Sequence, residues 1–180
     1  MDSLAGKLLI ANANLFDPNF RRAIILVGHH DGDGAMGVVL NRALGVTVAE
    51  VVPALGSLVG DEAPVFVGGP VQPAAVVVVA DFEDPSEAGV LAFDSVGFLP
   101  EETDEATIGR IRRARVFAGY AGWGEGQLES ELEEESWVIT SALAEDVFHP
   151  DPARLWDDVL RRLGHSYDLL RLMPVDPSMN

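Results

Sequence analysis

The sequence predicts an α+β fold that forms a single domain. Short apolar segments joined by hairpin turns alternate with isolated helices, and no regular strand–helix–strand repeat is visible. This mixture favours α+β over a parallel α/β array. The chain has 180 residues, of which 48% are hydrophobic, and its mean hydropathy is +0.17. A chain of this length and composition can bury one core.

The first forty residues predict three strands and one hairpin. Apolar runs indicate strands at residues 7–11, 23–28 and 35–41. The quartet Asp31–Gly34 is rich in turn residues, so it predicts a hairpin between the second and third strands. Asp17 followed by Pro18 is typical of a helix N-terminus, and we expect a short helical turn there.

The middle of the chain predicts a buried central strand with shorter strands on either side. Thr47–Glu50 has a capping-box pattern and should start a short helix that Pro53 and Gly56 limit. Residues 74–80 are apolar and mostly β-branched on both faces, which indicates a strand buried on both sides. The flanking strands are expected at residues 64–68 and 89–93.

Two helices are predicted in the last third of the chain. Residues 103–113 should form the first, capped by Thr103 or Asp104. Asp151-Pro152 should open the second, which Gly164 ends. The apolar positions of the second helix fall on one face, namely Leu155, Trp156, Val159, Leu160 and Leu163.

Between these helices lies a corner that is unusually rich in glycine, residues 116–137. A strand at 116–120 should lead through a glycine turn into a helix that begins near Gly126, and Trp137 should begin the next strand. Leu128 and Leu132 are four residues apart and should anchor this helix to the core. Its acidic residues should mostly face solvent; they are Glu129, Glu131, Glu133 and Glu134.

The net charge of −17 disfavours direct binding of nucleic acid. A field of this sign repels a phosphate backbone, whose binding requires cations that displace counterions. Residues 110–115 form the one dense basic segment of the sequence. We interpret it as the end of a helix whose arginines pair with the acidic residues just before it, at Glu101, Glu102, Asp104 and Glu105.

Standard catalytic, cofactor and metal motifs do not fit the sequence. The corner glycines fail the dinucleotide fingerprint, because Gln127 or Glu129 stands where its third glycine is required. Asp31–Gly34 resembles the start of a calcium loop, but Arg42 occupies the position of the essential glutamate. Neither a Walker loop nor a Gly-x-Ser-x-Gly elbow is present. We therefore predict no catalytic, cofactor-binding or metal-binding residues, and no cofactor.

The chain also lacks the marks of secretion or membrane insertion. It contains no cysteine, so disulfides and thiolate chemistry are excluded. No basic region precedes an apolar core at the N-terminus. The longest apolar run, residues 74–80, is far shorter than a bilayer span of about 20 residues. We expect a soluble protein of the cytoplasm that does not bind a membrane.

Five segments together resemble the YqgE/AlgH family of bacterial proteins, and they follow one another in the family's order. Ala43 and Glu125 depart from positions where the family commonly has proline. The resemblance spans nearly the whole chain, so it implies a single YqgE/AlgH-like domain over residues 1–180. The segments are Gly6–Asn12, Phe16–Arg21, Gly34–Arg42, Val67–Val71 and Gly119–Glu129.

The resemblance implies a bent, bifurcated and mostly antiparallel sheet that forms a partial barrel flanked by helices. It implies no established activity, cofactor or catalytic residue. Some members carry the label of transcriptional regulator, linked to exopolysaccharide control. The sequence itself shows no helix-turn-helix signature.

Two interpretations of the corner remain open, one of packing and one of recognition. In the first, Tyr120 and Trp123 are packing residues. In the second they join Gln127, Asn41 and Arg42 in a candidate recognition patch, because aromatic, arginine and amide groups suit binding more than proton transfer.

Three hypotheses for function follow. The leading one is a non-enzymatic regulatory or interaction protein that acts through a protein partner. The second is a small-molecule-binding protein or an enzyme with a pocket near residues 119–127. The third is direct nucleic-acid binding through residues 110–115, which the charge ranks last. The oligomeric state is left open.

Overall fold

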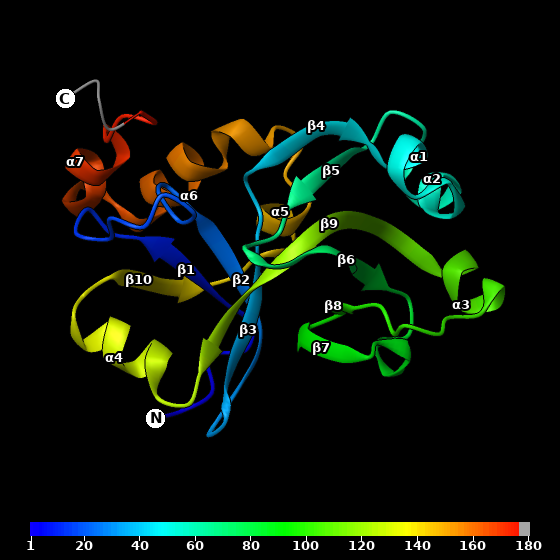
Figure 1. Ribbon diagram of the computed structural model, residues 1–180, viewed down its shortest axis with the longest axis horizontal. Coiled ribbons are helices and arrows are strands. Elements are labelled where there is room, and N and C mark those ends of the chain that lie inside the picture. Colours follow the sequence, from blue (N-terminus) through cyan, green and yellow to red (C-terminus); the bar gives the residue numbers. More distant parts are fainter. Residues whose placement is uncertain (177–180) are drawn as a thin grey trace.

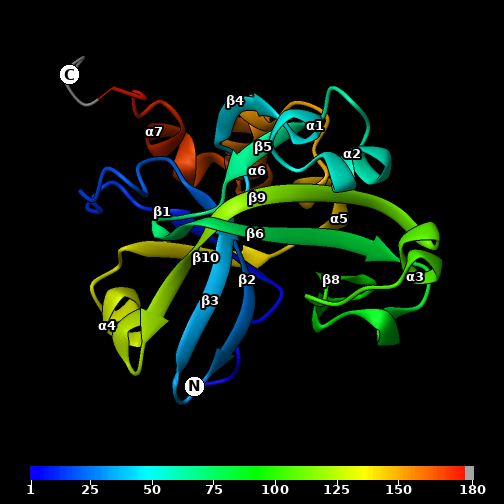
Figure 2. The same cartoon turned by 45° about the vertical axis from the view of Figure 1, so that its right-hand side comes forward.

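The computed structural model describes residues 1–176, in which ten strands form one bent, open sheet with helices on its faces (Figures 1 and 2). The order along the sheet is β10-β1-β2-β3-β9-β6-β8-β7, and β4 and β5 branch from it. All strand pairs are antiparallel except β5–β9. This confirms the predicted α+β class and the bifurcated sheet.

Seven strands lie close to the predicted segments, β9 is much longer than predicted, and β4 and β8 were not predicted. They are β1 (Lys7–Ala11), β2 (Ile24–Asp31), β3 (Gly34–Val39), β4 (Ala43–Thr47), β5 (Pro64–Val67), β6 (Val71–Phe82), β7 (Val90–Phe93), β8 (Val96–Phe98), β9 (Ile111–Gly124) and β10 (Trp137–Ser141). The helices are short. They are α1 (Val48–Val51), α2 (Pro53–Val59), α3 (Glu105–Gly109), α4 (Gln127–Glu133), α5 (Ala144–Val147), α6 (Leu155–Leu163) and α7 (Asp168–Arg171), with 3₁₀ turns at 85–87, 152–154 and 165–167.

The sheet forks along one edge of β9, the long curved strand that crosses Figure 2. The end of β9 pairs with β3, while its middle pairs in parallel with β5. Gly68 lies in the fork, where its N–H donates to the carbonyl of Ala118 and its own carbonyl accepts from the N–H of Val39. One glycine thus links both branches of the sheet.

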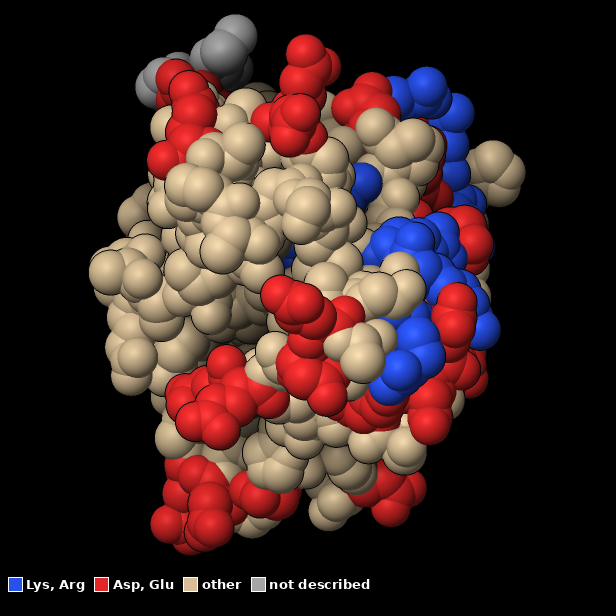
Figure 3. Space-filling model, turned by 90° about the vertical axis from the view of Figure 1, so that its right-hand side faces the viewer, with Lys and Arg blue, Asp and Glu red and all other residues tan. Residues whose placement is uncertain are grey.

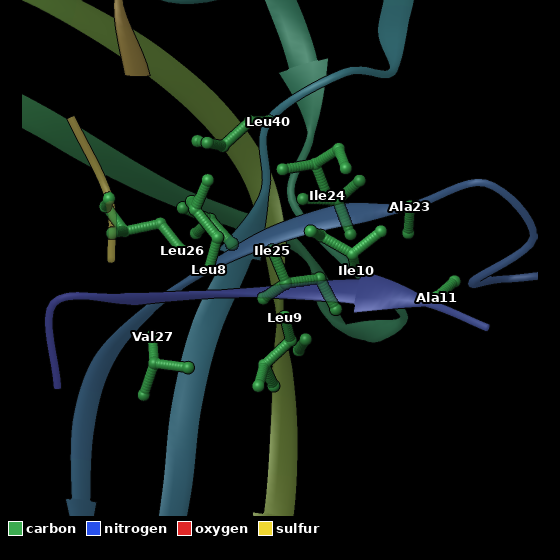
Figure 4. Close-up of a cluster of buried hydrophobic side chains, with 14 of the residues drawn as sticks. Leu8, Leu9, Ile10, Ala11, Ala23, Ile24, Ile25, Leu26, Val27 and Leu40 are labelled. Carbon is green, nitrogen blue, oxygen red and sulfur yellow. The ribbon is translucent and has the colours of Figure 1, made fainter. Parts of the chain in front are cut away.

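The main core is built around β1 and β2 (Figure 4), and the side chains on both faces of these two strands are buried in it. Residues 8–11 and 23–27 are fully buried. Helix α6 adds its apolar face, with Trp156 1% exposed. This explains why both strands read as continuous apolar runs, since a strand covered on both faces needs no polar alternation.

A second, smaller core lies where α1 and α2 pack near β5, β6 and β9. Its buried members are Val48, Val65, Val78 and Val116. The predicted capping box of α1 is present, because Thr47 and Glu50 bond each other's backbone N–H groups. Pro53 limits this helix as expected, because α1 ends at Val51. Gly56 does not, since it lies inside α2; Pro53 occupies the first turn of α2, where a missing N–H costs nothing.

Residues 103–113 do not form the single helix that was predicted, because α3 ends at Gly109 and β9 begins at Ile111. Asp104 does cap α3, but the sheet pairing of β9 outweighs local helix propensity beyond it. At Asp17-Pro18 the expected short turn is present. The Asp17 carboxylate accepts from the N–H of Asn19 and the Asp17 carbonyl from that of Phe20, and residues 18–22 form successive turns.

The expectation that residues 74–80 are buried on both faces holds only for the second half of that segment. Val78, Val79 and Ala80 are buried, whereas Val76 is 48% exposed. The cause is an irregularity in the pairing with β9 between Val71 and Val76. There β6 bulges away, and β8 pairs only with residues 79–81.

Gly69 should be intolerant of any side chain. It has φ +155° and a Cβ there would lie 2.2 Å from the backbone of Tyr120. Gly69→Ala should therefore cost about 3 kcal/mol or more of unfolding free energy, from overpacking and backbone strain together. Gly60→Ala is the matched control, with φ +95° and nothing near the added Cβ; it should cost about 1–2 kcal/mol. Equal losses in urea unfolding would contradict the close approach at the fork.

Candidate functional site

Arg42 holds the loop of residues 17–23, which joins β1 to β2. Its guanidinium donates to the backbone carbonyls of Pro18, Asn19 and Arg21, with the bond to Arg21 at 2.7 Å. Burial lowers the pKa of Arg42, and the nearby charge of Asp17 opposes that shift. The charged side chain of Arg42 therefore holds the loop in place through these hydrogen bonds.

Asn41 secures the end of the same loop. Its amide donates to the carbonyl of Arg22 at 2.9 Å and accepts from the N–H of Ile24 at 3.0 Å. Between them Arg22 adopts φ +53°, a conformation that costs about 1–2 kcal/mol for a residue with a side chain. The two hydrogen bonds of Asn41 hold this turn in place, so its side chain is already engaged.

An aromatic cluster ties this loop to the glycine-rich corner. Phe20 stacks on Trp123 with ring centroids 6.4 Å apart, and it meets Trp137 edge-on at 5.7 Å. Trp123 and Trp137 are also edge-on to each other, at 6.1 Å. Such pairs are worth about 0.5–1.5 kcal/mol each beyond the area they bury. Phe20 thus bridges the two parts of the predicted patch, although no pattern singled it out.

Glu131 completes the cluster and does not simply face solvent as expected. One of its carboxylate oxygens accepts from the indole N–H of Trp123 at 2.9 Å and of Trp137 at 2.7 Å. The other accepts from the amide of Gln127 at 3.1 Å. Gln127 in turn accepts from the N–H of Gly124. The predicted roles of Leu128 as an anchor and of Glu133 as an exposed residue are confirmed.

The structure does not gather the five patch residues on one surface. Trp123 is 6% exposed and Gln127 is exposed, and they share Glu131. Tyr120 is three residues before Trp123 on β9, so strand alternation directs its side chain to the other face. Asn41 and Arg42 lie on the far side of the 17–23 loop, where they border a groove.

The groove beside Asn41 and Arg42 has a volume of about 690 Å³. Two further arginines from the loop line it, and the Arg22 guanidinium lies over the Trp156 ring at 5.5 Å from its centroid. Phe16 stands at the groove with 87% of its surface exposed. The lining residues are Leu15, Phe16, Pro18, Arg21, Arg22, Asn41, Arg42, Ala153, Trp156, Val175 and Asp176.

The segment that follows α7 forms part of the groove wall. Arg21 donates from Nε and one terminal nitrogen to the carbonyl of Pro174, at 3.0 and 2.7 Å, and from Nε to that of Val175 at 3.1 Å. Val175 and Asp176 lie among the lining residues, and both are in a bend. Arg21 therefore holds a piece of the chain at the groove through its main-chain carbonyls.

His30, which is buried, and His149, which is half-buried, link separate parts of the chain through hydrogen bonds. His30 accepts the N–H of Leu4 at Nδ1, so Nε2 carries the proton and donates to Glu129 at 2.7 Å. This bond lowers the pKa of Glu129. His149 repeats the arrangement, with Nδ1 accepting from Asp151 and Nε2 facing Asp158. Both ring nitrogens of each are in use, which leaves neither free to activate a nucleophile.

The basic segment at the start of β9 lies among carboxylates, but not those that the sequence suggested. Arg110 pairs with Glu87, and Arg112 and Arg113 share the buried Asp81. Figure 3 shows basic side chains along one side of this face with acidic ones between them. Arg110 lies at a helix end as predicted, as the C-cap of α3, whereas Arg112, Arg113 and Arg115 lie at the start of β9.

Residues 1–176 contain neither a metal-binding cluster nor a helix that could span a membrane. No cluster of three or more His, Asp or Glu side chains in this range is placed to hold a metal ion. None of its helices has both the length and the apolar character that a membrane crossing demands.

Glu131→Ala should destabilise the protein by about 2–4 kcal/mol. It leaves two buried indole N–H groups without an acceptor, and each such loss costs about 1–3 kcal/mol. Glu133→Ala, on the same helix but exposed, should stay within about 0.5 kcal/mol of the wild type. Chemical unfolding followed by circular dichroism measures both. A similar small change in the two variants would show that Glu131 is a surface residue after all.

Comparison with known proteins agrees with this architecture. The model of the AlgH-like family (DUF179) matches residues 8–168. A UPF0301 protein of Streptomyces avermitilis is 39% identical over 189 residues, which covers 100% of this chain and 97% of that protein. A UPF0301 protein of Streptomyces coelicolor is 40% identical over 187 residues, with the same coverage.

Two solved structures share the fold. The crystal structure of a Corynebacterium diphtheriae protein has a TM-score of 0.86 and 27% identity, and covers 96% of this chain and 94% of its own. The solution structure of the AlgH protein from Pseudomonas aeruginosa has a TM-score of 0.73 and 28% identity, with 96% and 95% coverage. From its motifs, its fold and these relatives, the chain belongs to the AlgH-like family.

Proposed function

We propose that this protein is a non-catalytic interaction protein whose arginine-lined groove binds an extended segment of a protein partner. The observation that carries the proposal is the contact of Arg21 with the carbonyls of Pro174 and Val175. Main-chain carbonyls are common to every polypeptide, so a groove that binds them in its own chain has the chemistry to bind them in another.

The composition of the groove supports a peptide over a small polar substrate. Phe16 is an exposed aromatic side chain at its edge, and aromatic and arginine residues dominate the energetics of protein interfaces. Arg42 and Asn41 fix the loop of residues 17–23, which carries Arg21, so this binding group is held before a partner arrives. Such preorganisation lowers the entropic cost of binding.

A role in transcription would then be exercised through the partner, in the cytoplasm. Of the arginines at 110–115, the candidates for nucleic-acid contact, Arg110, Arg112 and Arg113 already pair with Glu87 and Asp81. The remaining field of the chain is strongly negative and repels phosphates.

Site-specific photo-crosslinking tests the proposal. A photoreactive phenylalanine analogue is placed at Phe16 in the full chain, and in a matched control at Leu91, a residue of β7 that is 45% exposed. In cells of the source organism, the Phe16 position should crosslink one defined protein that the Leu91 position does not. The same products from both positions, or none from Phe16, would contradict the assignment of the groove.

A second pair of variants tests the role of Arg21 in the same assay. Deleting residues 174–180 should increase the crosslinked product, because it removes the segment that Arg21 holds at the groove. Arg21→Ala should decrease it, because the partner's carbonyls lose their donors. Arg161→Ala is the control, since this arginine lies on α6 and pairs with Asp157. Equal products from Arg21→Ala and Arg161→Ala would overturn the proposed contact.

A further inference from the structure

A second hollow, separate from the groove, opens between the β5–β9 pair and the segment after α5. Its volume is about 290 Å³, at the small end of the range for ligand pockets. Three stretches far apart in the sequence line it, namely residues 59–66, 113–116 and 148–152.

Arg115 is the polar group at the centre of this hollow. It is half-buried, its guanidinium lies 5.1 Å from the centroid of the Phe66 ring, and one terminal nitrogen donates to the carbonyl of His149. Its other guanidinium nitrogens have no hydrogen-bond partner among residues 1–176. These nitrogens are not fully buried, so they are accessible from the hollow that Arg115 lines.

Arg115 also lacks a carboxylate partner within the described residues. Burial lowers its pKa, and the neighbouring charge of Arg113 lowers it further. Seven other arginines form ion pairs with carboxylates: Arg110, Arg112, Arg113, Arg154, Arg161, Arg162 and Arg171. Within the described residues Arg115 shares the lack of an ion pair with Arg21, Arg22 and Arg42, which border the groove.

The charge around the hollow is positive on balance. Arg113 lies over the Phe148 ring at 4.6 Å from its centroid, and it shares the buried Asp81 with Arg112. Glu145 approaches Arg113 at 3.7 Å from an exposed position. The charged residues that line the hollow are Arg113 and Arg115, and no carboxylate is among the lining residues. A half-buried cation with an unmatched charge attracts an anion strongly, because screening by water is weak there.

The remaining walls are apolar. Phe148 is half-buried at the hollow, and Pro64, Pro150 and Pro152 add aliphatic groups, whereas the ring of Phe66 is buried beneath Arg115. Planar apolar groups pack well against aromatic rings and guanidinium planes. We propose that this hollow binds a small organic anion, whose carboxylate or phosphate group pairs with Arg115 and whose flat apolar body lies against Phe148 and the prolines.

Titration of the full chain with four probes tests the proposal. The probes are benzoate, phenyl phosphate, benzamide and inorganic phosphate, followed by backbone amide shifts in NMR spectra. At least one aromatic anion should bind, with shifts confined to residues that line the hollow. Benzamide and inorganic phosphate should bind at least tenfold more weakly. Absence of binding by both aromatic anions, or equal binding of benzamide and benzoate, would overturn the proposal.

Variants then assign the binding to Arg115. Arg115→Gln should weaken binding of the aromatic anion at least tenfold, whereas Arg161→Gln makes the same charge change at an exposed site and should leave the affinity unaltered. Unchanged affinity in Arg115→Gln would refute the assignment. If that variant does not fold, the comparison of benzoate with benzamide on the unaltered chain decides the matter, because the two differ chiefly in charge.

Discussion

The fold depends on the close approach of backbones at the fork of the sheet. Gly68 fits between β3 and β9 because a side chain there would lie 2.2 Å from the carbonyl oxygen of Gly119. Gly68 forms hydrogen bonds to both branches of the sheet. The end of β9 can therefore pack in the main core while its middle packs in the second core. The groove and the hollow lie on loops attached to these two branches, and both inherit their positions from this one contact.

Local patterns in the sequence were enough to predict most strands and the class of the fold. Residues 7–11 and 23–28 are continuous apolar runs, and such runs identify buried strands. The length of β9 could not be predicted, because Gly119 with φ +71° resembles a turn while neighbouring strands keep it in the sheet. The fork could not be predicted either, since it joins Gly68 to residues about 30 and 50 positions away.

The candidate site was predicted only in part, because residue type does not tell which side chains are already engaged. Asn41 and Arg42 do border a groove, but they act on the loop. Arg21 and Phe16, which carry the proposed binding, were quoted only within a family motif. The dipeptide Arg21-Arg22 in a chain with 12 basic residues was the available signal. Contacts such as Arg21 with Pro174 span the whole chain and leave no local pattern.

The central claim is that the groove binds polypeptide through Arg21, as it binds residues 174–176 of its own chain. NMR relaxation of the backbone amides of Val175 and Asp176 tests this most directly, in the wild type and in Arg21→Lys. Lysine keeps the charge but cannot donate to two carbonyls in a fixed geometry. The account predicts that both amides are ordered in the wild type and become more mobile in the variant. Equal mobility in the two proteins would contradict it.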